Sequence, residues 1–98
     1  MAADSLHTLC ALIRAARAGE LPIAAFCDRY ETVFNLEVDK ASLAVSDLRP
    51  LAELFEKVAW FSPYPDERKV MPNYLGENDI ARALEAISAF SEAKLRNE

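Results

Sequence analysis

Apolar residues recur at intervals of three and four positions in four separate parts of the chain, which is the spacing of one face of an α-helix. The four stripes are Leu6, Leu9, Cys10, Ile13 and Ala16; Ile23, Phe26, Cys27, Tyr30, Val33 and Phe34; Leu51, Leu54, Phe55, Val58 and Phe61; and Ile80, Ala83, Leu84, Ile87 and Phe90. No stretch shows the convincing alternation of apolar and polar residues that is typical of a strand. The pattern therefore predicts an all-α protein, a four-helix bundle with a short up-down arrangement.

Residues with special backbone preferences mark the expected ends of the first two helices. Asp4 or Ser5 can cap the start of the first helix, and Gly19 is placed to end it in a left-handed conformation. Pro22 suits the first position of the second helix because its φ angle is fixed near the helical value. The link between the two helices is short, so they are expected to pack antiparallel.

Prolines delimit the predicted third helix. Pro50 disfavours helical geometry at Arg49, so this helix is expected to begin between Ser46 and Pro50. Pro63 and Pro65 must end it, because two prolines within three residues cannot continue a helix.

Two connecting segments complete the prediction. Residues 37–46 are compatible with a loop, a short helical turn or the early part of the third helix. Residues 62–76 contain three prolines and are expected to form a structured loop before a last helix over about 77–94.

Length and composition define the class of protein. The chain has 98 residues, which is enough for one domain over residues 1–98 with one hydrophobic core. Its hydrophobic fraction of 52% excludes an intrinsically disordered chain. The first residues lack the basic start of a signal peptide, and no apolar run approaches the roughly 20 residues that span a bilayer. We therefore expect a cytoplasmic protein without a membrane contact.

The residues that usually carry catalysis do not form a recognisable pattern. His7 is the single histidine and has no partner residue at a catalytic spacing, and a phosphate-binding loop cannot be built from Gly19 and Gly76 alone. Cys10 and Cys27 fall on apolar stripes, where a thiol behaves as a small hydrophobic group. We expect no enzymatic activity, no cofactor and no metal.

The negative charge is concentrated in the middle of the sequence. The formal net charge is −5, and residues 31–67 hold eight acidic and three basic residues, whereas acids and bases balance on either side. An acidic chain is not expected to bind nucleic acid directly. The middle segment is either an ordinary solvated surface or one acidic surface for a cationic partner.

The predicted third helix carries an aromatic residue beside two of these acids, which is compatible with an acidic surface for a cationic partner. At 100° per residue, Trp60 lies almost opposite the core direction and in line with Glu53 and Glu56. Tryptophan and tyrosine are enriched at the energetic centres of protein interfaces. The alternative is that Trp60 packs under the following loop, against Tyr64 or Tyr74.

The proline-stiffened loop extends this surface. Tyr64, Asp66 and Glu67 would add an acidic and aromatic edge beside the helix. Stiffness lowers the entropy cost of presenting such groups to a partner.

The order of these features resembles that of the colicin D-type immunity proteins, a family of small helical bacterial antitoxins. The resemblance covers most of the chain: a helical pair is followed by a third helix that ends in Val58-Ala59-Trp60-Phe61, the loop Pro63-Tyr64-Pro65-Asp66-Glu67-Arg68, and a last helix with an acidic start. It implies a four-helix bundle that binds a tRNA-cleaving toxin domain and covers its basic active-site cleft with acidic groups in place of RNA phosphates. Such toxins act as bacteriocins or in contact-dependent growth inhibition. The chain departs from the pattern at Arg68 and Lys69, which partly offset the acids before them.

These observations together predict an immunity protein, monomeric when free, whose partner is a basic toxin nuclease domain that acts on RNA. The expected phosphate mimics are Glu53, Glu56, Asp66 and Glu67, and the expected aromatic anchors are Trp60 and Tyr64. The alternative is a helical adaptor or oligomerisation domain, in which Trp60 serves a hydrophobic self-interface. A small enzyme-associated subunit is a third, weaker possibility.

Overall fold

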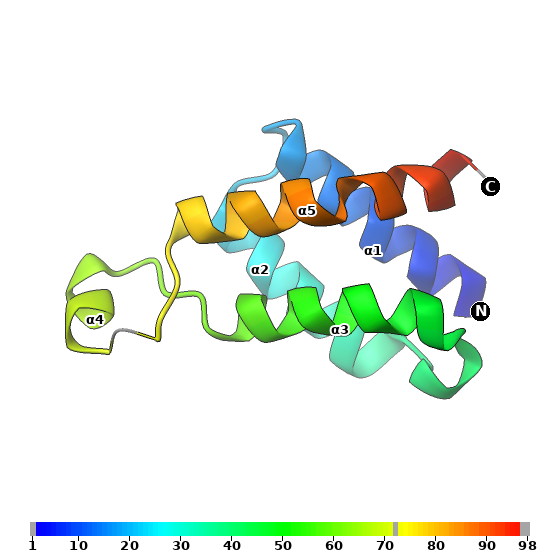
Figure 1. Cartoon of the computed structure of the whole chain (residues 1–98), viewed down its shortest axis with the longest axis horizontal. Coiled ribbons are helices and arrows are strands. Elements are labelled where there is room, and N and C mark those ends of the chain that lie inside the picture. Colours follow the sequence, from blue (N-terminus) through cyan, green and yellow to red (C-terminus); the bar gives the residue numbers. More distant parts are fainter. Residues whose placement is uncertain (1, 72, 97–98) are drawn as a thin grey trace.

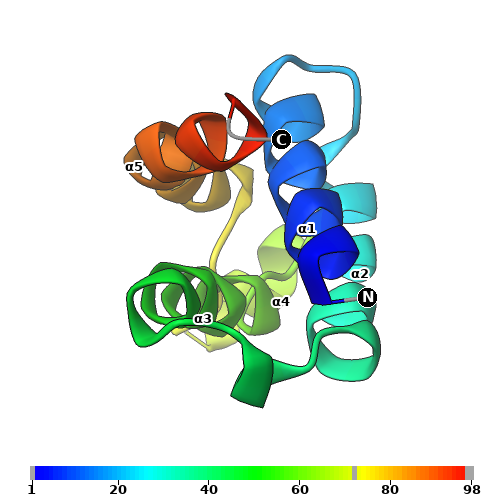
Figure 2. The same cartoon turned by 90° about the vertical axis from the view of Figure 1, so that its right-hand side faces the viewer.

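Four long helices surround one apolar core in the computed structural model, which describes residues 2–71 and 73–96 (Figure 1). The helical elements are α1 (Ala2–Arg17), α2 (Ile23–Thr32), the π-helix η1 (Val33–Glu37), the 3₁₀-helix η2 (Lys40–Ser42), α3 (Val45–Ala59), α4 (Pro65–Val70) and α5 (Glu77–Arg96). Viewed end-on, α3 and α5 lie on one side of the bundle, and α1 and α2 lie on the other (Figure 2). The all-α prediction is confirmed. No helix of the described chain combines the length and the apolar character needed to cross a membrane.

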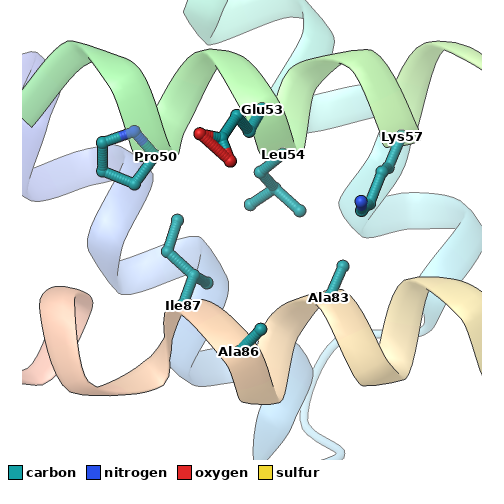
Figure 3. Close-up of a pocket in the computed structure, with 7 residues that line it drawn as sticks. All are labelled: Pro50, Glu53, Leu54, Lys57, Ala83, Ala86 and Ile87. Carbon is teal, nitrogen blue, oxygen red and sulfur yellow. The ribbon is translucent and has the colours of Figure 1, made fainter.

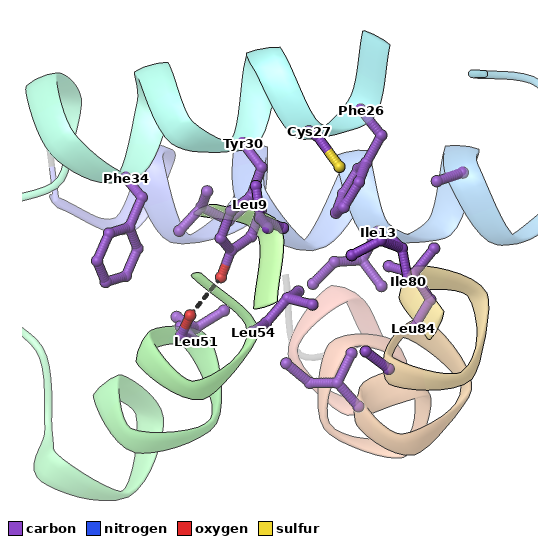
Figure 4. Packing of buried hydrophobic residues seen from close by; sticks show 14 of the residues in the cluster. Leu9, Ile13, Phe26, Cys27, Tyr30, Phe34, Leu51, Leu54, Ile80 and Leu84 are labelled. Atoms are coloured by element: carbon purple, nitrogen blue, oxygen red, sulfur yellow. Dashed lines mark hydrogen bonds between the residues drawn. The ribbon is translucent and has the colours of Figure 1, made fainter. Parts of the chain in front are cut away.

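The core is built from the predicted stripes (Figure 4). Its most deeply buried large side chains include Leu9, Ile13, Phe26, Tyr30, Leu51, Val58, Ile80 and Leu84. Each such side chain stabilises the fold by about 1.5–3 kcal/mol relative to an exposed one. The residues at the margins of the stripes are partly buried and pack against this cluster: Leu6, Ile23, Phe55, Phe61 and Phe90.

Gly19 ends α1 as the sequence predicts. Its φ angle is +78°, a conformation that side chains with a Cβ atom rarely adopt. The N–H of Glu20 donates to the carbonyl of Ala15 at 2.9 Å, and the N–H of Gly19 donates to that of Ala16 at 3.2 Å. These two bonds form a Schellman motif, which satisfies carbonyls at the helix end and turns the chain toward α2.

The predicted starts of the first two helices need correction. α1 begins at Ala2, ahead of both Asp4 and Ser5, so neither residue is its cap. The hydroxyl of Ser5 donates instead to the carbonyl of Glu37, at the end of η1, over 3.1 Å. Pro22 is the cap residue before α2 and not its first helical residue.

The predicted start of α3 is also wrong, because Pro50 lies inside the helix and not at its beginning. α3 begins at Val45. Pro50 has no N–H to donate to the carbonyl of Ser46, one turn earlier, so the helix loses one hydrogen bond. Leu51 and Leu54 directly follow the proline and are buried, and their packing outweighs the local preference.

Residues 37–46 are mainly short helical turns. The carboxylate of Asp39 accepts the N–H of Ala41 at 3.2 Å and so caps η2. The ammonium of Lys40 donates to the carbonyl of Phe34 at 2.9 Å, which ties η2 back to η1. Only the last residues of this segment belong to α3.

Residues 62–76, predicted as a loop, contain the short helix α4. α3 ends at Ala59, two residues before the end of its apolar stripe, and the chain then forms an isolated parallel β-bridge. The N–H of Ser62 donates to the carbonyl of Leu75 at 2.9 Å, and the N–H of Leu75 donates to that of Trp60 at 2.8 Å. This bridge closes the base of a projection, the α4 lobe (residues 62–71 and 73–75), which extends beyond one end of the bundle (Figure 1).

The burial of the two thiols leads to a test of the core. Cys10 and Cys27 are both buried, and desolvation, aided by the nearby Glu31 and Asp28 carboxylates, raises the pKa of Cys27 to about 12. Because the thiolate is the reactive form, we expect a thiol reagent at pH 8 to label the native protein slowly and the denatured protein rapidly. Rapid native labelling of either cysteine, measured by mass spectrometry, would contradict the assignment of its helix face.

Candidate functional site

The outer side of α3 carries two exposed carboxylates and an aromatic side chain. Glu53 and Glu56 are exposed, and Trp60, the residue that caps the C-terminal end of α3, is 45% exposed. The three side chains border one surface hollow, together with Lys57, Asn73 and Leu75. We call Glu53, Glu56 and Trp60 the acidic face. The sequence prediction placed these residues together, and the structure does so.

The carboxylates of the acidic face have no basic partner within the described chain. The nitrogen atoms of Lys, Arg and His in that part of the molecule all lie more than 4.0 Å from the oxygens of Glu53 and Glu56. Lys57 follows Glu53 by one helical turn without forming an ion pair. The negative charge of this face is therefore available to a group outside the molecule.

Two glutamates of α5, in contrast, serve the fold. Arg14 donates to both carboxylate oxygens of Glu92, at 2.6 and 3.0 Å, and this hydrogen bonding holds the pKa of Glu92 below its usual value. Arg17 makes the same kind of contact with Glu85, at 3.2 and 3.3 Å. Both pairs join α1 to α5, the two helices with the most extensive mutual contact.

Trp60 is held in place and still partly open. Its ring packs against that of Tyr74, with the centroids 5.8 Å apart and the planes tilted by 50°. The alternative prediction, that Trp60 packs against Tyr64 or Tyr74 of the following loop, is therefore confirmed for Tyr74. Nearly half of the side chain remains accessible, and an aromatic group that is already positioned loses little entropy when a partner covers it.

Glu67 has a contact inside the α4 lobe. The buried hydroxyl of Ser62 donates to its carboxylate at 2.5 Å. The guanidinium of Arg68 donates to the carbonyl of Ser62 at 2.6 Å and lies so close to Gly76 that a Cβ atom there would meet it at 3.2 Å. These contacts fix α4 on its β-bridge, so one carboxylate of the predicted set is already used within the molecule.

The remaining predicted residues are on the surface of the lobe. Tyr64 and Asp66 are exposed. Two apolar residues that the sequence reasoning missed, Val70 and Met71, are exposed beside them, and Val70 is 76% accessible. α4 has only six residues and no buried one, so no helical stripe could have drawn attention to it. The predicted site thus falls into two parts, the acidic face on α3 and the exposed end of the α4 lobe.

A small hollow lies between α3 and α5. Its volume is about 150 Å³. Its lining is mostly aliphatic, with Glu53 and Lys57 at its border (Figure 3). Over the described part of the chain, no group of three His, Cys, Asp or Glu residues is arranged to hold a metal ion.

Comparisons with protein-family models, with curated proteins and with solved structures find no match for this chain. The resemblance to the colicin D-type immunity proteins, which rests on the order of the helices and on residues 58–68, stays a prediction.

The two pairs of glutamates give opposite expectations for stability. Reversing Glu85 and Glu92 together to Lys removes both α1–α5 ion pairs and places like charges together, so the melting temperature should fall. Reversing Glu53 and Glu56 to Lys breaks no pair, so the melting temperature should change little. Circular dichroism melts of the two variants at low salt measure the difference. Equal melting temperatures would show that the two ion pairs between α1 and α5 do not contribute measurably to stability.

Proposed function

We propose that this chain is an immunity protein, which binds and neutralises the basic RNA-cleaving domain of a bacterial toxin in the cytoplasm. The observation that carries the proposal is the acidic face: Glu53 and Glu56 are exposed and have no basic partner among residues 2–71 and 73–96, and Trp60 is partly exposed beside them. A nuclease must hold phosphates in an electropositive cleft. Carboxylates on a neighbouring protein can occupy that cleft and exclude the RNA.

The position of the acidic face suits a mode of inhibition in which its carboxylates occupy the phosphate-binding cleft of the nuclease. α3 is anchored in the core by Leu51, Leu54 and Val58, so the carboxylates on its other side are presented from a rigid element. Rigidity lowers the entropy cost of association, and complementary charge raises its rate. Asp66 and Tyr64, on the α4 lobe, would extend the contact beyond α3.

A second candidate is a helical adaptor or oligomerisation domain. The exposure of Tyr64, Val70 and Met71 on the lobe favours it, because contiguous apolar surface often marks a protein interface. In that case the contact would depend on the apolar side chains and would not depend on the carboxylates of α3.

A charge reversal separates these candidates. If the reading frame upstream of this chain encodes a basic domain, that domain is the binding partner for the assay. We expect Glu53→Lys/Glu56→Lys to retain the helical circular dichroism signal and to weaken binding by roughly two orders of magnitude or more, since like charges at an interface cost several kcal/mol. Cells that express the toxin domain should lose protection.

The matched control is Glu20→Lys/Asp28→Lys, which changes the net charge equally at two exposed acids on the α1–α2 side that form no ion pair within the described residues. This variant should bind and protect nearly as well as the parent. If the Glu53 and Glu56 reversal also leaves binding and protection intact, the acidic face is an ordinary solvated surface and the proposed mode of inhibition is wrong.

Trp60 can be tested separately as an anchor. Trp60→Ala should weaken binding of the same domain by about 2 kcal/mol or more, the usual loss at an aromatic interface centre. Trp60→Phe retains a ring that can pack against Tyr74 and should lose less. Isothermal titration calorimetry measures both variants. An alanine variant with parental affinity would place Trp60 outside the contact.

A further inference from the structure

α3 carries a second apolar row, beside the one that faces the core. The core row is formed by Leu51, Leu54 and Val58. The second row follows the same spacing of three and four residues and consists of Val45, Leu48, Ala52, Phe55 and Ala59. We call it the outer row. At 1.5 Å per residue it is about 21 Å long.

The outer row is only partly open on the surface: Leu48, Ala52 and Phe55 are partly buried and also pack against the core cluster, whereas Val45 and Ala59 are exposed. Val45 is 71% exposed, although it is a β-branched apolar residue in the first turn of the helix. Most of the outer row lines a shallow hollow of about 610 Å³, bordered by Arg49, Glu53 and Glu56. This hollow has room for several side chains of a partner.

η1 packs against one residue of the outer row. The ring of Phe55 stacks on that of Phe34, with the centroids 4.8 Å apart, so η1 lies against the inner edge of the outer row. Leu36, in the same π-helix, is 80% exposed. The hollow is therefore lined by apolar residues of the outer row and bordered by Glu53, Glu56 and Arg49.

The spacing of the outer row indicates what kind of element fits. Rows of side chains at intervals of three and four residues pack against the corresponding rows of another helix. An amphipathic helix would place its apolar stripe in the hollow and its flank beside Glu53 and Glu56. The border carries two acids and one base, Arg49, within the segment that holds the whole net negative charge of the chain, so a flank with Lys or Arg is the complementary one.

We infer that the outer row of α3 is the docking site for a basic amphipathic helix of about 15 residues on the partner protein. This inference rests on the proposed function only for the identity of the partner that carries the helix.

A second copy of the chain fits the same surface less well. In an antiparallel pair of α3 helices centred on Ala52, the two Glu53 side chains would lie next to each other near the axis. Like charges that face each other oppose association, and the net charge of −5 on each copy adds to the repulsion. A basic helix would experience neither the repulsion between two Glu53 side chains nor the repulsion between two acidic chains.

The experiment uses the full chain and a synthetic probe. The probe is a 15-residue peptide with leucine at intervals of three and four positions and lysine elsewhere, and its control has the same composition with the stripe disrupted. We expect the probe to perturb the backbone NMR signals of residues 45–60 in the ¹⁵N-labelled protein. The shuffled control should bind at least about tenfold more weakly.

Matched variants distinguish the outer row from simple charge attraction. Val45→Glu/Ala52→Glu adds two negative charges within the row, and Val70→Glu/Met71→Glu adds the same two charges to exposed apolar residues of the α4 lobe. If charge alone decides binding, both variants bind the cationic probe more tightly. If the outer row is the docking site, the first variant binds about tenfold more weakly and the second does not.

Three results would overturn the inference: equal binding of the striped and shuffled peptides, tighter binding by the Val45 and Ala52 variant, or self-association of the free chain through residues 45–60 in sedimentation experiments. If the proposed immunity function is wrong but the docking site is right, the experiments give a different result. In that case the basic toxin domain is neither bound nor inhibited by the chain, while the striped peptide still binds the outer row.

Discussion

The orientation of α3 depends on one buried hydrogen bond. Tyr30 of α2 is completely buried, and its hydroxyl donates to the carbonyl of Leu51 at 2.6 Å (Figure 4). A buried hydroxyl needs a partner, because an unsatisfied one costs about 1–3 kcal/mol. Burial also raises the pKa of Tyr30, so the donor stays protonated. Together with the stack of Phe34 on Phe55, this bond fixes the rotation of α3 about its axis, and the side of α3 that faces away from the core follows from it.

This rotation explains why the acids of the molecule have different roles. Glu85 and Glu92 of α5 face α1, where arginines bind them and hold the two helices together. Glu53 and Glu56 are exposed on α3, Glu53 at the border of the hollow between α3 and α5, and neither forms an ion pair within the described chain, so their charge is available to solvent or to a partner. The outer row, with Val45 at its start, lies beside them on the same exposed side. A helix that carries both a charged edge and a partly exposed apolar row is more consistent with an interface than with a solvated surface.

The sequence predicted what depends on local periodicity and missed what depends on contacts between distant residues. The four apolar stripes and the left-handed Gly19 follow from helix geometry alone, and the outward direction of Glu53 and Glu56 follows from the same 100° rotation. Pro50 was assigned to the start of α3 because only the burial of its neighbours shows that packing outweighs its local cost. α4 has no buried residue and was missed for that reason. The two ion pairs between α1 and α5 join residues 68 and 78 positions apart, which no local pattern indicates.

Carboxyl footprinting of the chain with and without its proposed partner, a basic toxin nuclease domain, tests the central claim most directly. A carbodiimide couples an amine to exposed carboxylates, and mass spectrometry then locates each modified residue in the free and the bound protein. If α3 binds through its outer side, Glu53 and Glu56 should be protected in the complex, whereas Glu20 and Asp28 should be modified as in the free chain. Equal modification of Glu53 and Glu56 with and without the bound domain would contradict the assignment of α3 as the binding helix.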